Sequence, residues 1–170
     1  MNSQRISLWP FEASDLDEMQ AVMGNPDVMR FSISGPKKKT ETEDFIKQCR
    51  AQYDEFGFGL LAVVYKEENR VIGYCGLFRQ EIDGLIELEI GYRLHPSYWG
   101  RGIATEAAGM IRDWAFANLG REKLISIIEP ENAASIAVAK KLGMNFERAF
   151  LFKGHRSAHI YSVKKTKILN

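Results

Sequence analysis

The sequence has little of what marks membrane, secreted or nucleic-acid-binding proteins. Its formal net charge is only +1, whereas a dedicated nucleic-acid binder usually carries a clear basic excess. No apolar run approaches the roughly 18 residues needed to span a membrane. The polar start Met1–Arg5 lacks the apolar segment of a signal peptide. We therefore expect a cytoplasmic protein that binds neither nucleic acid nor membrane.

The sequence also has few cysteines and histidines, the residues that bind metal or form disulfides. Cys49 and Cys75 have no histidine or cysteine at metal-ligand spacing beside them, so buried thiols in a reducing compartment are expected. His155 and His159 have no acidic partner at helical spacing, which favours surface or core positions for both. We therefore expect no metal site.

The length and composition that are present are typical of one globular domain. The 170 residues are 45% hydrophobic and 26% charged, which fits a single hydrophobic core. No internal repeat, low-complexity tract or long linker divides the chain. We expect one domain over residues 1–170, as a monomer or a homodimer.

The first half of the chain changes from helical to strand periodicity. Capping-box patterns predict helices that open at Ser14 with Asp17 and at Thr40 with Glu43. Alternating or continuous apolar runs predict strands at Arg5–Trp9, Phe58–Tyr65, Val71–Phe78 and Ile86–Leu94. Since short turns join the last three strands, we expect an antiparallel meander.

The second half alternates strands and helices. Apolar spacing predicts a helix over Ile103–Leu119, a strand over Lys123–Ile128 and a helix capped by Asn132, followed by strands at Phe146–Phe152 and His159–Val163. This alternation implies a parallel crossover. The predicted fold class is therefore α/β (α+β), with a mixed sheet and helices on both faces.

A glycine-rich turn between a strand and a helix is the most informative stretch. Gly100, Gly102 and the small Ala104 let the backbone approach a ligand closely. The first N–H groups of the following helix have no intrahelical partner and lie at the positive end of its dipole. Together these features suit a diphosphate. Its negative charge would also offset the mild repulsion between the Arg101 cation and the positive end of the helix dipole. A simple tight turn is an equally good explanation of this segment alone.

Two runs of this chain resemble a known family. The residues from Glu89 to Pro96 and from Trp99 to Ala107 are similar to the central motif of the GNAT N-acetyltransferase superfamily. That motif is Gln/Arg-x-x-Gly-x-Gly/Ala, from which Trp99 departs at the first position. The run from Glu129 to Met144 resembles the next motif, in the form of the branch that acetylates the N-termini of bacterial ribosomal proteins.

The resemblance implies acetyl-coenzyme A as the donor and a mostly antiparallel GNAT-like sheet. It further implies a splayed V between the parallel strands that end near Leu94 and Ile128, where the pantetheine arm would pair with strand backbone. The residues expected to bind the cofactor are Tyr92, Leu94, Trp99, Gly100, Arg101, Gly102, Ile103, Ala104, Thr105, Asn132 and Ser135.

The expected catalytic residues are Glu89 and Ser135. Glu87 and Glu89 share one side of their strand, so we expect Glu89 to be the general base, directly or through a water, and Glu87 to help attract an ammonium group. A solvated acidic face near the hairpin is the alternative. The resemblance places Ser135 near the sulfur of the donor. Many members of the family use a tyrosine as the general acid, and the corresponding position here is Ala139.

The predicted activity is transfer of an acetyl group to a primary amine, foremost the N-terminal α-amine of a protein or peptide. An enzyme of the same fold that acetylates a small amine, such as a polyamine, an aminoglycoside or an amino acid, is the first alternative. A sensor that binds acetyl-coenzyme A without turnover is the second, because the family's tyrosine is absent.

Overall fold

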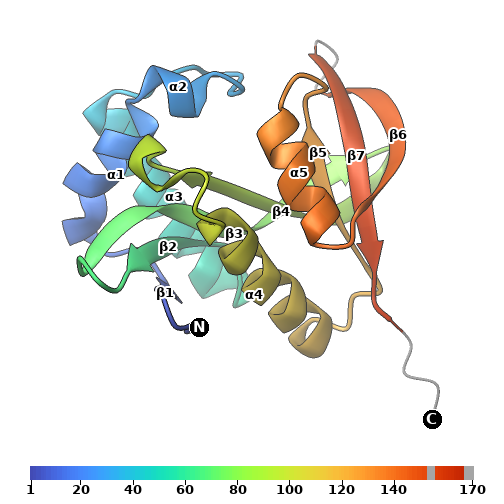
Figure 1. Ribbon diagram of the computed structural model, residues 1–170, viewed down its shortest axis with the longest axis horizontal. Coiled ribbons are helices and arrows are strands. Elements are labelled where there is room, and N and C mark those ends of the chain that lie inside the picture. The colour runs from blue at the N-terminus through green and yellow to red at the C-terminus, as the bar shows by residue number, and fades with distance from the viewer. Residues whose placement is uncertain (153–155, 167–170) are drawn as a thin grey trace.

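The computed structural model describes residues 1–152 and 156–166, so His155 lies outside the described residues. The helices are η1 (Ala13–Asp15), α1 (Leu16–Met23), α2 (Pro26–Met29), α3 (Lys39–Phe56), η2 (Pro96–Tyr98), α4 (Ile103–Asn118) and α5 (Ala133–Lys141). The strands are β1 (Ile6–Trp9), β2 (Leu60–Tyr65), β3 (Arg70–Ile82), β4 (Leu85–Leu94), β5 (Lys123–Ile128), β6 (Asn145–Phe152) and β7 (Arg156–Lys164). Figure 1 shows their arrangement.

All strands join one sheet in the order β1-β2-β3-β4-β5-β7-β6. Strands β1 to β4 form an antiparallel meander, and β5, β7 and β6 are also antiparallel to their neighbours. The junction between the two groups is the parallel pair β4 and β5, which α4 connects. The predicted mixed, mostly antiparallel sheet is therefore confirmed.

Helices cover both faces of the β1–β4 half, as strand β2 illustrates. Leu60, Ala62 and Val64 pack with the helices α1, α2 and α3 on one face, whereas Leu61 and Val63 pack with α4 on the other. Successive side chains of a strand point to opposite faces. A strand covered on both faces therefore reads as a continuous apolar run.

The start of the first helix differs from the capping box predicted at Ser14 and Asp17. A short 3₁₀ turn precedes α1, and the Glu12 N–H donates a hydrogen bond to the Asp15 carboxylate at 2.8 Å. The α-helix proper begins at Leu16. The prediction was wrong because the reciprocal pattern is met two residues earlier in the chain, by Glu12 and Asp15.

The second predicted capping box, at Thr40 and Glu43, is also wrong by two residues. Helix α3 begins at Lys39, and the Lys38 N–H donates to Glu41 Oε2 at 2.8 Å. Glu43 instead pairs with Lys47 one turn along the helix, at 2.7 Å. Both carboxylates satisfy a local rule, and the sequence alone does not say which one caps.

Helix α2 is a single turn that the sequence prediction missed. After α1 ends at Met23, Asn25 Oδ1 accepts the N–H of Asp27 at 2.9 Å and so caps a new turn. Pro26 occupies the first helical position, where its missing N–H costs nothing. This turn stands opposite α5 across the middle of the sheet (Figure 1).

Two features that the described residues lack bear on function. No helix among residues 1–152 and 156–166 combines the length and apolar character needed to cross a bilayer. In the same ranges no three or more His, Cys, Asp or Glu side chains are grouped so that they could hold a metal ion.

Candidate active site

The parallel strands β4 and β5 separate shortly after they meet. One register pair, Glu89 with Ile125, joins them within the described residues, whereas β3 and β4 pair along nearly their whole length. Ser126 Oγ donates a hydrogen bond to the Ile90 carbonyl oxygen at 2.9 Å, close to this pair. The predicted V between the two strands is therefore confirmed.

A cleft of about 500 Å³ lies where the strands have parted. We call it the β4–α4 cleft, because the end of β4, the turn at residues 99–102 and the first turn of α4 form much of its wall. Most of the residues predicted to bind the donor line it: Tyr92, Leu94, Trp99, Gly100, Gly102, Ile103, Ala104, Thr105, Asn132 and Ser135.

The turn before α4 has a backbone shape that requires glycine. Gly100 and Gly102 are both left-handed, with φ of 73° and 77°, a conformation that other residues adopt at a cost. The Glu106 N–H makes a hydrogen bond to the Gly102 carbonyl oxygen, and no side chain caps Gly102. The N–H groups of residues 103–105 therefore have no partner within the helix, and they lie at its positive end beside the cleft.

Trp99, where the motif departs from its usual first residue, has a structural role. Its indole Nε1 donates a hydrogen bond to the Leu94 carbonyl oxygen at 2.7 Å. This contact ties the turn to the end of β4. The side chain at this position therefore helps to hold the turn whose backbone faces the cleft.

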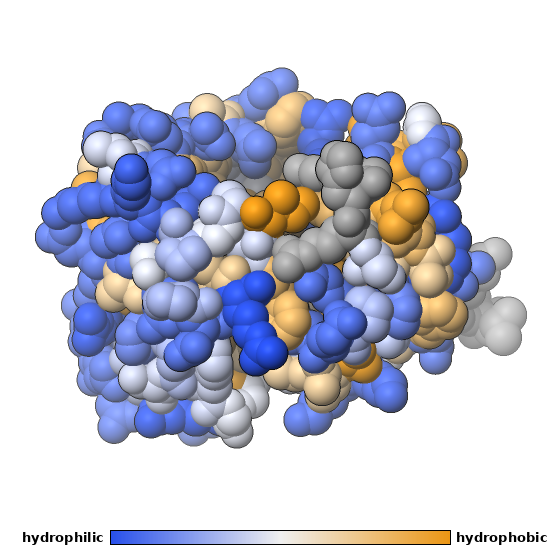
Figure 2. All heavy atoms as spheres, turned by 90° about the horizontal axis from the view of Figure 1, so that it is seen from above, coloured by the Kyte–Doolittle hydropathy of each residue, from blue (hydrophilic) through white to orange (hydrophobic). Residues whose placement is uncertain are grey.

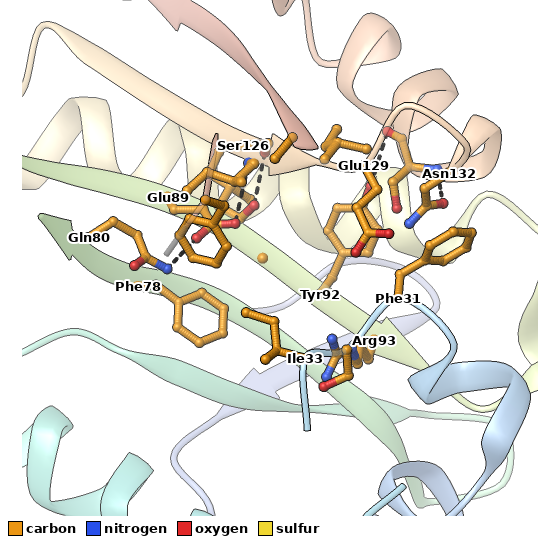
Figure 3. Close-up of a pocket in the computed structure, with 18 of the residues that line it drawn as sticks. Phe31, Ile33, Phe78, Gln80, Glu89, Tyr92, Arg93, Ser126, Glu129 and Asn132 are labelled. Atoms are coloured by element: carbon orange, nitrogen blue, oxygen red, sulfur yellow. Dashed lines mark hydrogen bonds between the residues drawn. The ribbon is translucent and has the colours of Figure 1, made fainter. Parts of the chain in front are cut away.

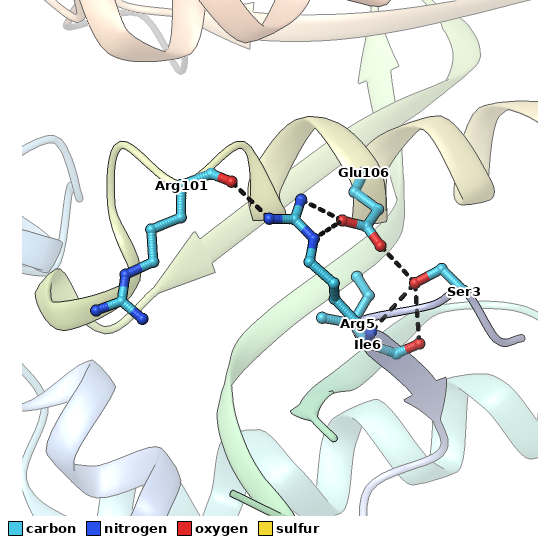
Figure 4. Close-up of polar contacts among 5 residues, drawn as sticks. All are labelled: Ser3, Arg5, Ile6, Arg101 and Glu106. Atoms are coloured by element: carbon cyan, nitrogen blue, oxygen red, sulfur yellow. Dashed lines mark hydrogen bonds and ion pairs between the residues drawn. The ribbon is translucent and has the colours of Figure 1, made fainter. Parts of the chain in front are cut away.

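Arg101 is the one predicted donor residue that does not line the β4–α4 cleft. Its guanidinium lies over the ring of Tyr98, 5.5 Å from the ring centre, so the expected contact between this side chain and a phosphate has no support here. Its carbonyl oxygen instead accepts a hydrogen bond from Arg5 Nη1 at 2.9 Å. Arg5 also forms an ion pair with Glu106, so it braces the turn against the helix (Figure 4).

A second cavity, of about 470 Å³, adjoins the first. We call it the Glu89 pocket; Figure 3 shows it. Its charged lining residues are Glu89, Glu129, Arg93 and Lys37, and its aromatic ones are Phe31, Phe45, Tyr74, Phe78, Tyr92 and Phe152. The two cavities share Phe31, Tyr92, Arg93, Asn132 and Ser135. Molecules bound in the two cavities would therefore meet at these side chains.

Glu89 is held in place by contacts from both neighbouring strands. Its Oε2 accepts a hydrogen bond from Gln80 Nε2 at 2.7 Å, and its Oε1 accepts one from the Ile127 N–H at 3.3 Å. The carboxylate is half-buried and is oriented by two hydrogen bonds to its charged form, which disfavours the alternative of a plain acidic surface. Glu87 lies outside the pocket and pairs with Lys123 at 2.5 Å, so its expected role in attracting an ammonium has no support.

A missing side chain on β4 makes room for an aromatic ring in the wall of this pocket. Gly91 lies between Glu89 and Arg93 on β4, and a Cβ there would come within 2.3 Å of the Phe78 ring. The ring of Phe78 therefore packs directly on the strand backbone. Any larger residue would push this ring from its position at the wall of the pocket.

Tyr92 and Ser135 form the boundary between the two cavities. The Tyr92 hydroxyl donates a hydrogen bond to the Ser135 carbonyl oxygen at 3.3 Å, and burial raises the pKa of this phenol, which keeps it protonated. Asn132 Oδ1 accepts the Ser135 N–H at 3.1 Å and caps α5, as predicted. Ala139, at the position where the resemblance described above would place a tyrosine, is buried in the core.

Several residues that line these cavities or brace their walls were not predicted from the sequence. Arg93 could have been found, because strand alternation places it on the face of Glu89. Gln80 and Phe78 depend on the register between β3 and β4, and Arg5 is 96 residues from the carbonyl it holds. No local signal identifies such partners.

Comparisons with known proteins agree with this geometry. Residues 5–145 match the model of the acetyltransferase (GNAT) domain family. The uncharacterized protein YkkB of Bacillus subtilis is 31% identical over 163 residues, which cover 95% of this chain and 94% of that protein. Spermidine N(1)-acetyltransferase of Escherichia coli is 27% identical over 153 residues, which cover 86% and 76%.

A solved structure shows the same fold. Ribosomal-protein-S5-alanine acetyltransferase of Vibrio fischeri superposes with a TM-score of 0.75 at 18% identity, and the match covers 96% of this chain and 95% of that one. The family match spans most of the chain. The protein therefore belongs to the GNAT family and is an acetyltransferase, a family whose donor is acetyl-coenzyme A. This membership disfavours the alternative of a sensor without turnover.

Proposed function

We propose that the protein transfers the acetyl group of acetyl-coenzyme A directly to a primary amine, the N-terminal α-amine of a protein or peptide. The observation that carries this proposal is the junction of the two cavities at Tyr92, Asn132 and Ser135. A donor in the β4–α4 cleft and an amine in the Glu89 pocket would face each other there.

Two parts of the donor would bind at different parts of the cleft: its diphosphate at the start of α4, and its pantetheine arm along β4. Its diphosphate would bind the N–H groups of residues 103–105, where the helix dipole and Gly100 and Gly102 favour a close anion. Its pantetheine arm would run along β4 in the opening toward β5 and pair with strand backbone. The thioester would then reach Asn132 and Ser135.

The acceptor must lose a proton before it attacks. An α-amine has a pKa of about 8, against about 10 for a lysine-like amine, so it needs less help than a lysine-like amine, although most of it is still protonated at neutral pH. Glu89 would take this proton, directly or through a water. The amine nitrogen then bonds to the thioester carbon, the C–S bond breaks, and the thiolate leaves with a proton from Ser135 or from water. This direct route needs no covalent enzyme intermediate.

A panel of amines tests the proposal by following thiol release from acetyl-coenzyme A. Peptides that begin with Ser or Ala should give saturable turnover, and the same peptides with a blocked N-terminus should give none. Mass spectrometry should place the acetyl group on the α-nitrogen. Turnover with polyamines and none with any peptide would contradict the proposed acceptor.

A small amine is a second candidate acceptor. One support is the relative named spermidine N(1)-acetyltransferase. The other is the presence of two carboxylates, Glu89 and Glu129, in the lining of one pocket. Two separated carboxylates suit a molecule with more than one ammonium group. The same panel decides between the two acceptors, because it measures kcat/KM for both classes under one set of conditions.

A further inference from the structure

The face of β4 that lines the Glu89 pocket carries two opposite charges. Glu89, Gly91 and Arg93 alternate onto one face of the strand, and all three line the pocket, whereas Leu88 is buried in the core on the other face. Figure 3 shows Glu89 and Arg93 at different ends of the cavity. The proposed function gives a role to Glu89, as the base, but none to Arg93.

Among the residues that the structure describes, Arg93 has no carboxylate partner of the kind that a half-buried guanidinium usually has. Its Nη1 approaches Met29 Sδ at 3.3 Å, a weak acceptor, and it also interacts with the Tyr74 phenol. Within residues 1–152 and 156–166, no carboxylate lies at ion-pair distance from it. Buried or half-buried charges are normally paired. A second cation, Lys37, lines the same pocket.

Arg93 also lies where an acceptor would be placed for reaction. It is one of the residues shared by the two cavities, together with Tyr92 and Ser135. A group bound by its guanidinium would therefore lie close to the amine that attacks the thioester. Guanidinium binds carboxylates through two parallel N–H donors, which fixes orientation as well as position.

We propose that the acceptor carries a carboxylate a few bonds from its reacting amine, and that Arg93 binds this carboxylate. The acceptor is then of the amino-acid type: a free amino acid, or a peptide with an acidic residue next to its N-terminus. The inference rests on the proposed amine acetylation and adds its specificity. In this arrangement Glu89 serves the amine and Arg93 serves the anion.

Matched acceptor pairs test this specificity. One arm compares ω-amino acids of increasing length with their primary amides, which keep a similar amine. The other compares peptides that begin Ser-Asp with peptides that begin Ser-Asn. In at least one arm, kcat/KM should be about tenfold or more higher for the carboxylate member, as expected for one charge-assisted contact. The arm with the larger ratio distinguishes a free amino acid from a peptide.

Two variants assign the effect to Arg93. Arg93→Met should raise the KM of the carboxylate member about tenfold or more, with the amide's KM within about twofold of its original value, while Arg93→Lys should keep part of the preference. Arg79→Met is the matched control. It removes one positive charge from a guanidinium that stacks on Phe56, outside both cavities, and it should preserve the preference.

Each contrary result has a distinct meaning. Equal kcat/KM for acids and amides in both arms would overturn the inference and leave amine acetylation intact. A rise in the KM of acetyl-coenzyme A with every acceptor, upon Arg93→Met, would assign Arg93 to the donor and also overturn it. Absence of turnover with any amine would contradict the proposed function itself. If Arg93→Met does not fold, Arg93→Lys and the acid-to-amide ratio of the unmodified protein still decide.

Discussion

Replacing Arg5 by methionine should weaken coenzyme A binding although Arg5 lines neither cavity. Arg5 Nη1 holds the Arg101 carbonyl oxygen at 2.9 Å, between the two left-handed glycines of the turn. A hydrogen bond from a charged donor contributes about 1.5–3 kcal/mol, but the Arg5 side chain is 42% exposed, so about 1 kcal/mol is the better figure. If all of it supports the binding shape of the turn, the Kd for coenzyme A rises about fivefold.

Isothermal titration of coenzyme A into the variant and the unmodified protein measures this change. Glu106→Gln is the matched control, since it removes the ion pair with Arg5 but keeps the bond from Arg5 to Arg101. It should lower stability with little effect on affinity. An unchanged Kd in a folded Arg5→Met protein would show that the turn needs no brace, and it would refute the reasoning.

The pH dependence of stability gives an independent check of the same pair. Burial alone would raise the pKa of the Glu106 carboxyl, but hydrogen bonds from Ser3 and Arg5 outweigh it and hold the pKa below its ordinary value of 4.5. A lowered pKa means that the pair stabilises the fold above pH 4.5, and that this stability is lost as the pH falls through the folded-state pKa. The difference in unfolding free energy between Arg5→Met and the unmodified protein should therefore shrink in that acidic range.

Three further predictions concern the Glu89 pocket and the assay. Glu89→Gln should lower kcat about a hundredfold with the KM of acetyl-coenzyme A nearly unchanged, whereas Glu87→Gln, which loses only the bond to Lys123, should keep most of kcat; equal losses in steady-state rates would remove Glu89 from the role of base. Gly91→Ala should push the Phe78 ring from its place and raise the acceptor's KM more than the donor's; the reverse order would mean that this wall does not contact the acceptor. Burial raises the pKa of the Cys49 thiol to about 12, so the native protein should react slowly with the disulfide reagent that detects released coenzyme A, and rapid labelling of Cys49 would contradict its burial.

Much of the fold could be predicted because its patterns are local. The continuous apolar run of β2 and the alternation in β4 are readable from neighbouring residues, and so is the Gly100 to Gly102 turn. Helix starts were less certain, since Glu41 and Glu43 both satisfy a local capping or pairing rule. Choosing between them depends on how the loop before α3 meets α1.

The parts of the candidate site that could be predicted are those formed by the backbone. The turn and the cap at Asn132 follow from short motifs, and the structure places both beside one cleft. Side chains that act across the sheet were not predictable. Glu87 pairs with Lys123, which lies on another strand. The Arg101 side chain lies over the Tyr98 ring, and its carbonyl oxygen accepts a hydrogen bond from Arg5. Such choices are set by three-dimensional packing rather than by spacing.

The brief contact between β4 and β5 has a thermodynamic consequence. Since little main-chain bonding joins the two groups of strands at that junction, a molecule that bridges them adds cohesion that the empty protein lacks. A ligand that binds only the native chain stabilises it by about 2.7 kcal/mol at a hundredfold excess over its Kd. Heat resistance should therefore report occupancy of the gap, even by compounds that never react, and a simple melting experiment could rank candidate occupants before any turnover is measured.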